Sequence, residues 1–174
     1  MLRRAHAFLA DRRGLAAVEF GLIAPVMIIM FFGAVELAPG VDCNSRVARV
    51  SATVSDLVAQ ETTVSSTDTT NIFSAAGAIL FPYSVSNAQI VVSSLVSDTT
   101  GKVTVAWSDC TTNTTKRTTP PANIPSGILP ASSSVIYAEI NYAYTPPVSY
   151  FLGPVNLKSN FYSKPRRSTK VVHT

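Results

Sequence analysis

Histidine is nearly absent from this 174-residue chain, and its only two copies, His6 and His173, lie close to the ends. A Ser/His/Asp or Cys/His catalytic arrangement therefore has no credible base. The sequence also lacks the motifs of phosphate-binding loops, HExxH zinc hydrolases and EF-hand loops. These absences predict a protein that is not an enzyme and that has neither a metal site nor a cofactor.

Cysteine is equally scarce, with Cys43 and Cys110 as the only two. Two cysteines cannot form a zinc site alone, and no C-x-x-C pattern occurs. Both follow the hydrophobic segment described below, so they would lie where disulfides can form. A bridge between them would close a loop of roughly 68 residues, worth about 4 kcal/mol. The alternatives are two free thiols or an intermolecular bridge.

Charged residues make up only 14% of the chain, although the net charge is +4. Asp11 is the only acid before residue 15, where four arginines gather: Arg3, Arg4, Arg12 and Arg13. Half of the other basic residues lie between positions 158 and 170. A basic leader and a basic tail are not the continuous basic face that nucleic-acid binding requires, so we expect no nucleic-acid partner.

One long hydrophobic run stands out, at residues 15–35, with Glu19 as its only charge. A helix of about 20 residues rises roughly 30 Å, which matches the hydrocarbon core of a membrane. The arginines just before it place the N-terminus in the cytoplasm and the rest of the chain on the exported side. A cleaved and released signal peptide is the alternative, but Glu36 and Pro39 flank Ala38, the plausible cleavage residue, and would hinder cleavage.

Two residues inside this run are unusual for a membrane helix. A carboxylate at the centre of the bilayer costs about 2.5–3.5 kcal/mol, and less near the interface where Glu19 would lie. Glu19 therefore either reaches the cytoplasmic interface or awaits a positive partner within the membrane. Pro25 removes a hydrogen bond to the carbonyl of Gly21, so we expect a bend between these two residues.

The remaining residues, 41–174, are predicted to form one exported α+β domain. Apolar residues at three- and four-residue spacings predict a helix over residues 41–60, separated from the membrane helix by a hinge or kink at Pro39-Gly40. A second helix is expected to begin with Asp68 as its N-cap and to run toward Pro82.

Beyond residue 82 the apolar period changes to two, which predicts an antiparallel sheet. Residues 89–97 and 102–108 read as a hairpin, with Val103, Val105 and Trp107 on one face. Residues 134–144 form the next strand, and residues 157–162, with 170–172 as a further candidate, add edge pairing. The apolar face of strand 134–144 comprises Ile136, Ala138, Ile140, Tyr142 and Tyr144, and a long polar loop over residues 110–133 precedes that strand.

Residues 12–37 resemble the TadE-like family of pseudopilins from tight-adherence (Flp-type) pilus systems. The resemblance rests on Arg12 and Arg13 before Gly14, on Glu19 and Phe20 as fifth and sixth residues after it, and on Pro25 and Glu36 further along. The family pattern implies cleavage between Gly14 and Leu15 by a prepilin peptidase. It also implies that Glu19, Phe20 and Pro25 belong to an assembly helix.

This resemblance divides the chain into a basic leader (residues 1–14), a membrane helix (15–38) and an exported domain (41–174). A helix followed by an antiparallel sheet is the pilin-like order of elements. The implied function is a minor pseudopilin or assembly component in the bacterial inner membrane, with other pilus subunits and assembly-machine proteins as partners. The alternative is an unprocessed, signal-anchored periplasmic binding or scaffold protein.

Overall fold

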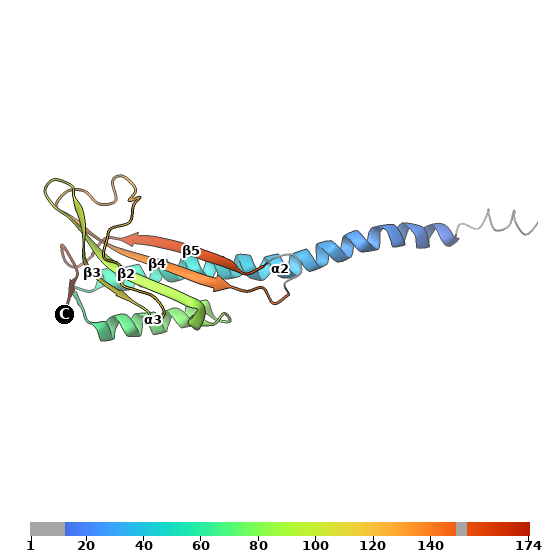
Figure 1. The fold of residues 1–174 in the computed structure, drawn as a ribbon, viewed down its shortest axis with the longest axis horizontal. Helices are drawn as coiled ribbons and strands as arrows, with labels where there is room; N and C mark the ends of the chain where they lie inside the picture. Colours follow the sequence, from blue (N-terminus) through green and yellow to red (C-terminus); the bar gives the residue numbers. More distant parts are fainter. Residues whose placement is uncertain (1–12, 149–152) are drawn as a thin grey trace, which may run out of the picture.

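The computed structural model describes residues 13–148 and 153–174. Residues 1–12, most of the predicted leader, lie outside the described residues. A long helix extends away from a small α+β head, which we define as residues 41–148 and 153–174 (Figure 1). The predicted fold class is confirmed: a long N-terminal apolar helix is followed by a second helix and a small antiparallel sheet.

The long helix α2 runs without interruption over Arg13–Gln60 and contains both Pro25 and Pro39. Its 48 residues span about 70 Å. The prediction that a hinge at Pro39-Gly40 divides this region into two helices is therefore wrong, whereas a kink within the continuous helix stays a prediction. Pro39 deletes a single helix hydrogen bond, the one to the carbonyl of Val35, and the helix continues beyond it because its next turns are packed on the sheet.

The C-terminal half of α2 supplies the centre of the head. Its buried residues recur every three or four positions, as a helix lying on a sheet requires, and each is at most 1% exposed: Cys43, Val47, Val50, Val54 and Val58. Ser51 and Ser55 on the same helix share hydrogen bonds of 2.9 and 3.0 Å with two serines of strand β5. The helix is thus held by apolar packing along its centre and by hydroxyl pairs at the sheet edge.

Helix α3 covers Ser66–Leu80 and buries Phe73, Ala76 and Leu80. Its N-cap is Ser65, whereas the sequence predicts Asp68 in that role. Asp68 instead occupies the third helical position, and the two residues form a capping box in which each side chain accepts from the other's backbone N–H. The helix therefore begins a few residues earlier than predicted. Serine and aspartate can both accept from the free N–H groups at a helix start, so the sequence alone does not say which of the two is the N-cap.

Replacing Ser65 by alanine is expected to lower the free energy of unfolding by about 1 kcal/mol, since one helix-end N–H loses its acceptor. Thermal unfolding of the detergent-solubilised protein measures this change. Ser74→Ala is the matched control, because Ser74 is exposed in the middle of the same helix and its hydroxyl only bonds the carbonyl of Thr70. An equal loss of stability in the two variants would contradict the capping role.

Four strands form the main sheet in the order β3-β2-β4-β5, all antiparallel to their neighbours. The strands are β2 (Ala88–Ser97), β3 (Val103–Cys110), β4 (Ser134–Tyr144) and β5 (Val155–Ser163). The hairpin and the strand over 134–144 are therefore confirmed. A 3-10 turn, η1 (Val85–Asn87), precedes β2, and helices α2 and α3 pack on the same face of the sheet (Figure 1).

The predicted apolar face of β4 lies in the main core, against α2 and α3. The same prediction for β3 is wrong in one residue. Val103 and Val105 pack with Leu95 on the outer face of the sheet, while Trp107 packs with the main core. A register shift in the β2–β3 pairing, between Ser94 and Leu95, adds one residue to β3 and reverses the alternation before Trp107.

The long loop after β3 covers part of the outer face of the sheet. Its Ile124, Ile128 and Leu129 pack against a small outer cluster formed by Leu95, Val135 and Tyr137. Arg117 at the start of the loop forms a bidentate contact with Glu139 of β4: its Nε donates to Oε1 at 3.1 Å and its Nη2 donates to Oε2 at 2.6 Å. The loop covers the end of the outer face that lies farther from the free part of α2.

The C-terminal residues return to the end of α2. Strand β6 (Val172–His173) pairs in parallel with β1 (Thr63–Val64). The carboxylate of Asp109, whose side chain is 6% exposed, accepts from Thr69 Oγ1 at 2.8 Å, His173 Nε2 at 2.8 Å and Lys116 Nζ at 2.6 Å. One carboxylate therefore joins α3, β3, the long loop and the C-terminus.

Candidate membrane and assembly segment

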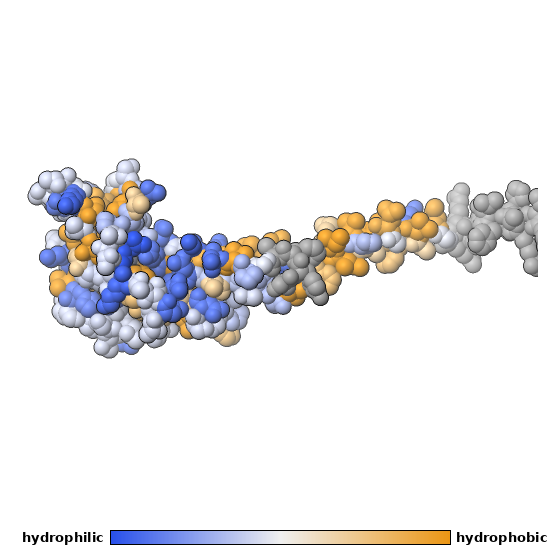
Figure 2. Space-filling model, in the orientation of Figure 1, coloured by the Kyte–Doolittle hydropathy of each residue, from blue (hydrophilic) through white to orange (hydrophobic). Residues whose placement is uncertain are grey.

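The candidate functional segment is the part of α2 that extends beyond the head, residues 14–35, which we call the free helix. Its large apolar side chains are open to the surroundings: Phe20 is 71% exposed and Leu22 is 74% exposed. Figure 2 shows this helix as largely hydrophobic and the head as mostly hydrophilic. Apolar exposure all around a helix is unfavourable in water and favourable in a lipid bilayer.

The length of the free helix agrees with a membrane span. About 20 residues of α-helix rise roughly 30 Å. Within the described residues, α2 is the one helix long and apolar enough to cross a membrane, and none of its most apolar stretch is buried in the head. These properties indicate single-pass membrane anchoring.

Glu19 lies in the second turn of the free helix and is exposed. Among the described residues it has no ion pair, because the head begins more than twenty residues further along the helix. Phe20 follows it directly on the same exposed surface. Glu19 and Phe20 are therefore neighbours on the exposed, apolar part of α2.

Gly14 and Leu15 lie in the first turn of α2, at the boundary of the described residues. No heavy atom lies within 4 Å of the position that a Cβ on Gly14 would occupy. The peptide bond after Gly14 is thus free of contacts with the head. Pro25 lies in the middle of the free helix, where it leaves the carbonyl of Gly21 without its usual helix donor.

The free helix is joined to the head through a rigid base. Glu36 is fully buried there, and the ring of Tyr144 lies against Gly40, with 3.5 Å between its Cε1 and the position of a Cβ on that glycine. Tyr83 donates to the carbonyl of Pro39 at 2.8 Å and to Asp42 at 3.1 Å. Burial, followed by the hydrogen bond to Asp42, raises the pKa of Tyr83 to about 12.

Arg46 fastens α3 at the same base. Its guanidinium donates to the carbonyls of Phe81 at 2.6 Å and Ile79 at 3.3 Å, and it pairs with Asp42 at 2.8 Å. These bonds satisfy carbonyls at the C-terminal end of α3, where a helix leaves its acceptors free. Arg46 therefore holds the C-terminal end of α3 against α2 at the base of the free helix.

The predicted bridge between Cys43 and Cys110 is not formed, and both thiols are free. Cys43 is buried in the core between α2 and the sheet. Asp109 points toward α3, so strand alternation turns its neighbour Cys110 to the opposite face of the sheet, where its thiol contacts the carbonyl of Thr114. The sheet separates the two sulfur atoms, and burial raises the pKa of the Cys43 thiol to about 11.

The described residues contain no cluster of side chains that could bind a metal ion. Within residues 13–148 and 153–174, no three His, Cys, Asp or Glu side chains lie close enough together to hold a metal ion. The cluster around Asp109 holds one carboxylate, one imidazole and one ammonium, which is an ion-pair arrangement.

The described chain therefore combines an exposed apolar helix, long enough to cross a membrane, with an α+β head that contains an antiparallel sheet. Residues 14–54 match the family model of the TadE-like protein. The resemblance to this family is thereby confirmed, and the match extends along α2 to Val54 in the core of the head. A TadE-like segment indicates a component associated with a tight-adherence pilus, with a structural or assembly role. Neither the curated proteins nor the solved structures include a match to this chain.

Proposed function

We propose that this chain is a minor pseudopilin or assembly component of a tight-adherence (Flp-type) pilus, cleaved after Gly14 by a prepilin peptidase. Its N-terminus would lie in the cytoplasm, its free helix in the inner membrane of a bacterium, and its head on the periplasmic side. The TadE-like match, which begins at residue 14, supports this proposal.

One observation carries the proposal: Glu19 is exposed on an apolar helix and has no ion pair within the described chain. A charge left unpaired in the membrane is costly, so a partner is favoured. Cleavage after Gly14 creates a free amine at Leu15, about one helical turn from Glu19. The carboxylate then pairs with the amine of its own or a neighbouring helix, and packing between subunits favours the register that forms this pair.

The size of the head favours a minor or assembly role over that of the repeating fibre subunit. The head comprises two helical segments and a four-stranded sheet outside the free helix. The resemblance to Flp-type pilus proteins implies major subunits that are very short peptides with little beyond the helix. Other pilus subunits and the proteins of the assembly machine are the expected partners of the free helix.

The mass of the protein extracted from membranes tests processing. In cells that contain the prepilin peptidase we expect a chain that begins at Leu15, and in cells without it a chain that begins at Met1. Gly14→Ala is expected to leave the chain full-length and still inserted. Gly33→Ala is the matched control, since Gly33 also lies on the free helix with no atom near its Cβ position. An intact Met1 in peptidase-containing cells would favour the unprocessed, signal-anchored periplasmic protein instead.

A further inference from the structure

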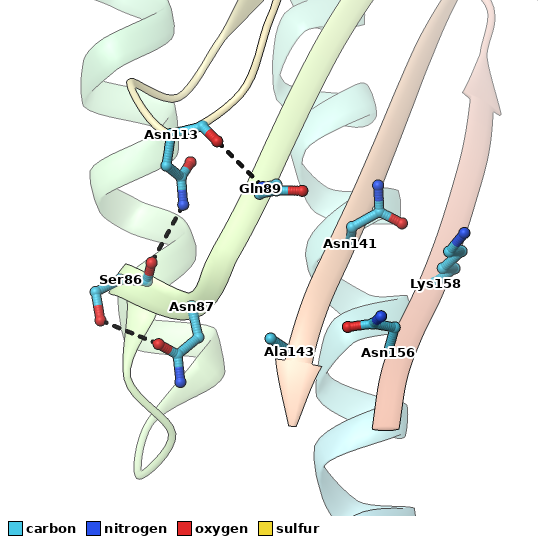
Figure 3. Close-up of a pocket in the computed structure, with 8 residues that line it drawn as sticks. All are labelled: Ser86, Asn87, Gln89, Asn113, Asn141, Ala143, Asn156 and Lys158. Carbon is cyan, nitrogen blue, oxygen red and sulfur yellow. Dashed lines mark hydrogen bonds between the residues drawn. The ribbon is translucent and has the colours of Figure 1, made fainter. Parts of the chain in front are cut away.

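A polar groove opens on the outer face of the sheet, away from both helices. Its volume is about 510 Å³, and eight residues line it (Figure 3): Ser86, Asn87, Gln89, Asn113, Asn141, Ala143, Asn156 and Lys158. The long loop covers the far end of this face, while the groove occupies the end near the base of the free helix. The outer face is therefore divided into a covered apolar half and an open amide-rich half.

The strand register aligns the polar side chains of the groove. Gln89 of β2 pairs with Asn141 of β4, which pairs in turn with Lys158 of β5. The three side chains form a row across three strands, because directly paired residues project to the same face. In the next row Ala143 pairs with Asn156. The small side chain of Ala143 leaves open space beside the amide of Asn156 (Figure 3).

Asparagine is depleted in β-strands because it fits a pleated surface poorly. Asn141 and Asn156 nevertheless occupy strands β4 and β5, and both are exposed. Neither they nor Lys158 has a side-chain hydrogen bond or ion pair with another residue of the described chain. Their donors and acceptors are thus available to a ligand.

The opposite wall of the groove is held in place. Asn113 in the loop donates to the carbonyls of Ser86 at 3.2 Å and Ala88 at 3.1 Å. Gln89 Nε2 donates to the Asn113 carbonyl at 3.1 Å, and in Figure 3 the Gln89 side-chain oxygen points away from that bond, toward the strand of Asn141. A fixed wall lowers the entropic cost of binding a ligand.

We propose that this groove binds a carboxylated oligosaccharide that carries acetamido groups. A side-chain amide has a donor and an acceptor in one plane, which matches an acetamido group or a pair of neighbouring hydroxyls. Lys158 supplies one positive charge for the carboxylate. Ala143 is the one apolar side chain among the described lining residues, so the groove offers little to the apolar side chains that anchor a bound peptide.

Calorimetry with the full-length protein in detergent tests the proposal with two matched probes. The first is a disaccharide of N-acetylglucosamine and N-acetylmuramic acid, and the second is N,N′-diacetylchitobiose, which keeps the acetamido groups but has no carboxylate. Saturable binding of both is expected, with tighter binding of the first. Asn141→Ala should weaken both by roughly tenfold, the effect of one lost hydrogen bond, and Lys158→Ala should remove the preference for the carboxylated probe.

Asn160→Ala is the matched control, because Asn160 is exposed on the same face of β5 but lies outside the groove. It should bind both probes as the wild type does. The absence of saturable binding, or equal effects of the Asn141 and Asn160 variants, would overturn the proposal. Binding of an extended peptide at these residues in place of either sugar would also overturn it. The assay requires neither processing nor a pilus, so its failure would leave the proposed function untouched.

Discussion

Replacing Glu19 by alanine is expected to abolish incorporation into pilus assemblies while leaving membrane anchoring intact. Glu19 is the single charge of the free helix, and its exposed side chain has no ion pair with another residue of the described chain. Removing a carboxylate from an apolar helix makes insertion easier, by up to about 3 kcal/mol at mid-membrane. Anchoring should therefore persist, whereas any contact that depends on the carboxylate is lost.

The size of this loss follows from the pair that Glu19 is proposed to form with the amine of Leu15. Breaking an ion pair buried in a membrane leaves an unpaired charge and costs about 3–5 kcal/mol, which lowers an association constant by roughly a hundredfold or more. Co-purification with cross-linked pilus partners measures the loss, and alkaline extraction of membranes measures anchoring.

Two substitutions separate the charge of Glu19 from its size and place. Glu19→Gln keeps the shape and removes the charge, so it should behave like the alanine variant. Val18→Ala changes a neighbour that is also exposed and should assemble normally. Normal assembly of both Glu19 variants would show that the carboxylate is merely tolerated near the interface, and the proposed pairing would be wrong.

The main elements of the head could be predicted because they follow short repeating patterns. Strand β4 was expected over residues 134–144 and is found there, since its apolar residues alternate without interruption. The free helix was equally predictable from one long hydrophobic run. In both cases the apolar pattern lies within one short stretch of sequence, and it can be recognised without knowing what that stretch packs against.

Three features depend on contacts that no local pattern reveals. The proline at position 39 suggested a hinge, but packing of the following turns on β4 and β5 keeps α2 continuous. The bulge before Trp107 reverses its face, and only the pairing with β2 shows it. The separation of Cys43 from Cys110 depends on which face of the sheet each residue occupies.

The polar groove was missed for a related reason. Its residues come from η1, β2, β4, β5 and the long loop, and none of them stands out within its own segment. Only the strand register brings Gln89, Asn141 and Lys158 into one row. The free helix, by contrast, is contiguous in sequence, so the sequence alone is sufficient to propose a role for it in assembly.

The carboxylate of Asp109 joins four parts of the head, and its loss is expected to have the largest effect on stability. Asp109→Ala removes the acceptor of Thr69, His173 and Lys116 at once. Hydrogen bonds to a charged group contribute about 1.5–3 kcal/mol, and the exposed ammonium of Lys116 can return to water. We therefore expect the free energy of unfolding to fall by about 2–4 kcal/mol, and the melting temperature by roughly 5–15 °C.

Acid should produce the same weakening in the wild type. Burial alone raises the pKa of Asp109, but hydrogen bonds from Lys116, His173 and Thr69 together outweigh burial and hold the pKa below its ordinary value. A lowered pKa stabilises the fold above the unfolded value of about 3.9, and this contribution is lost as the pH falls through the folded value. Wild type should thus lose stability below about pH 4 more steeply than Asp109→Asn, which has no carboxylate to protonate.

The ion pair between Asp56 and Arg166 provides the control for Asp109. It also connects the C-terminal segment to α2, but the Arg166 side chain is 62% exposed and that of Asp56 is 37% exposed. Exposed pairs contribute at most about 1 kcal/mol, so Asp56→Ala should shift thermal unfolding only slightly at neutral pH. If Asp56→Ala and Asp109→Ala were equally destabilising, the attachment of the C-terminus would matter more than the buried carboxylate. A larger loss of stability for Asp109→Ala, together with a weaker dependence of that variant's stability on pH below about 4, would identify the carboxylate as the group that joins β3, α3 and β6.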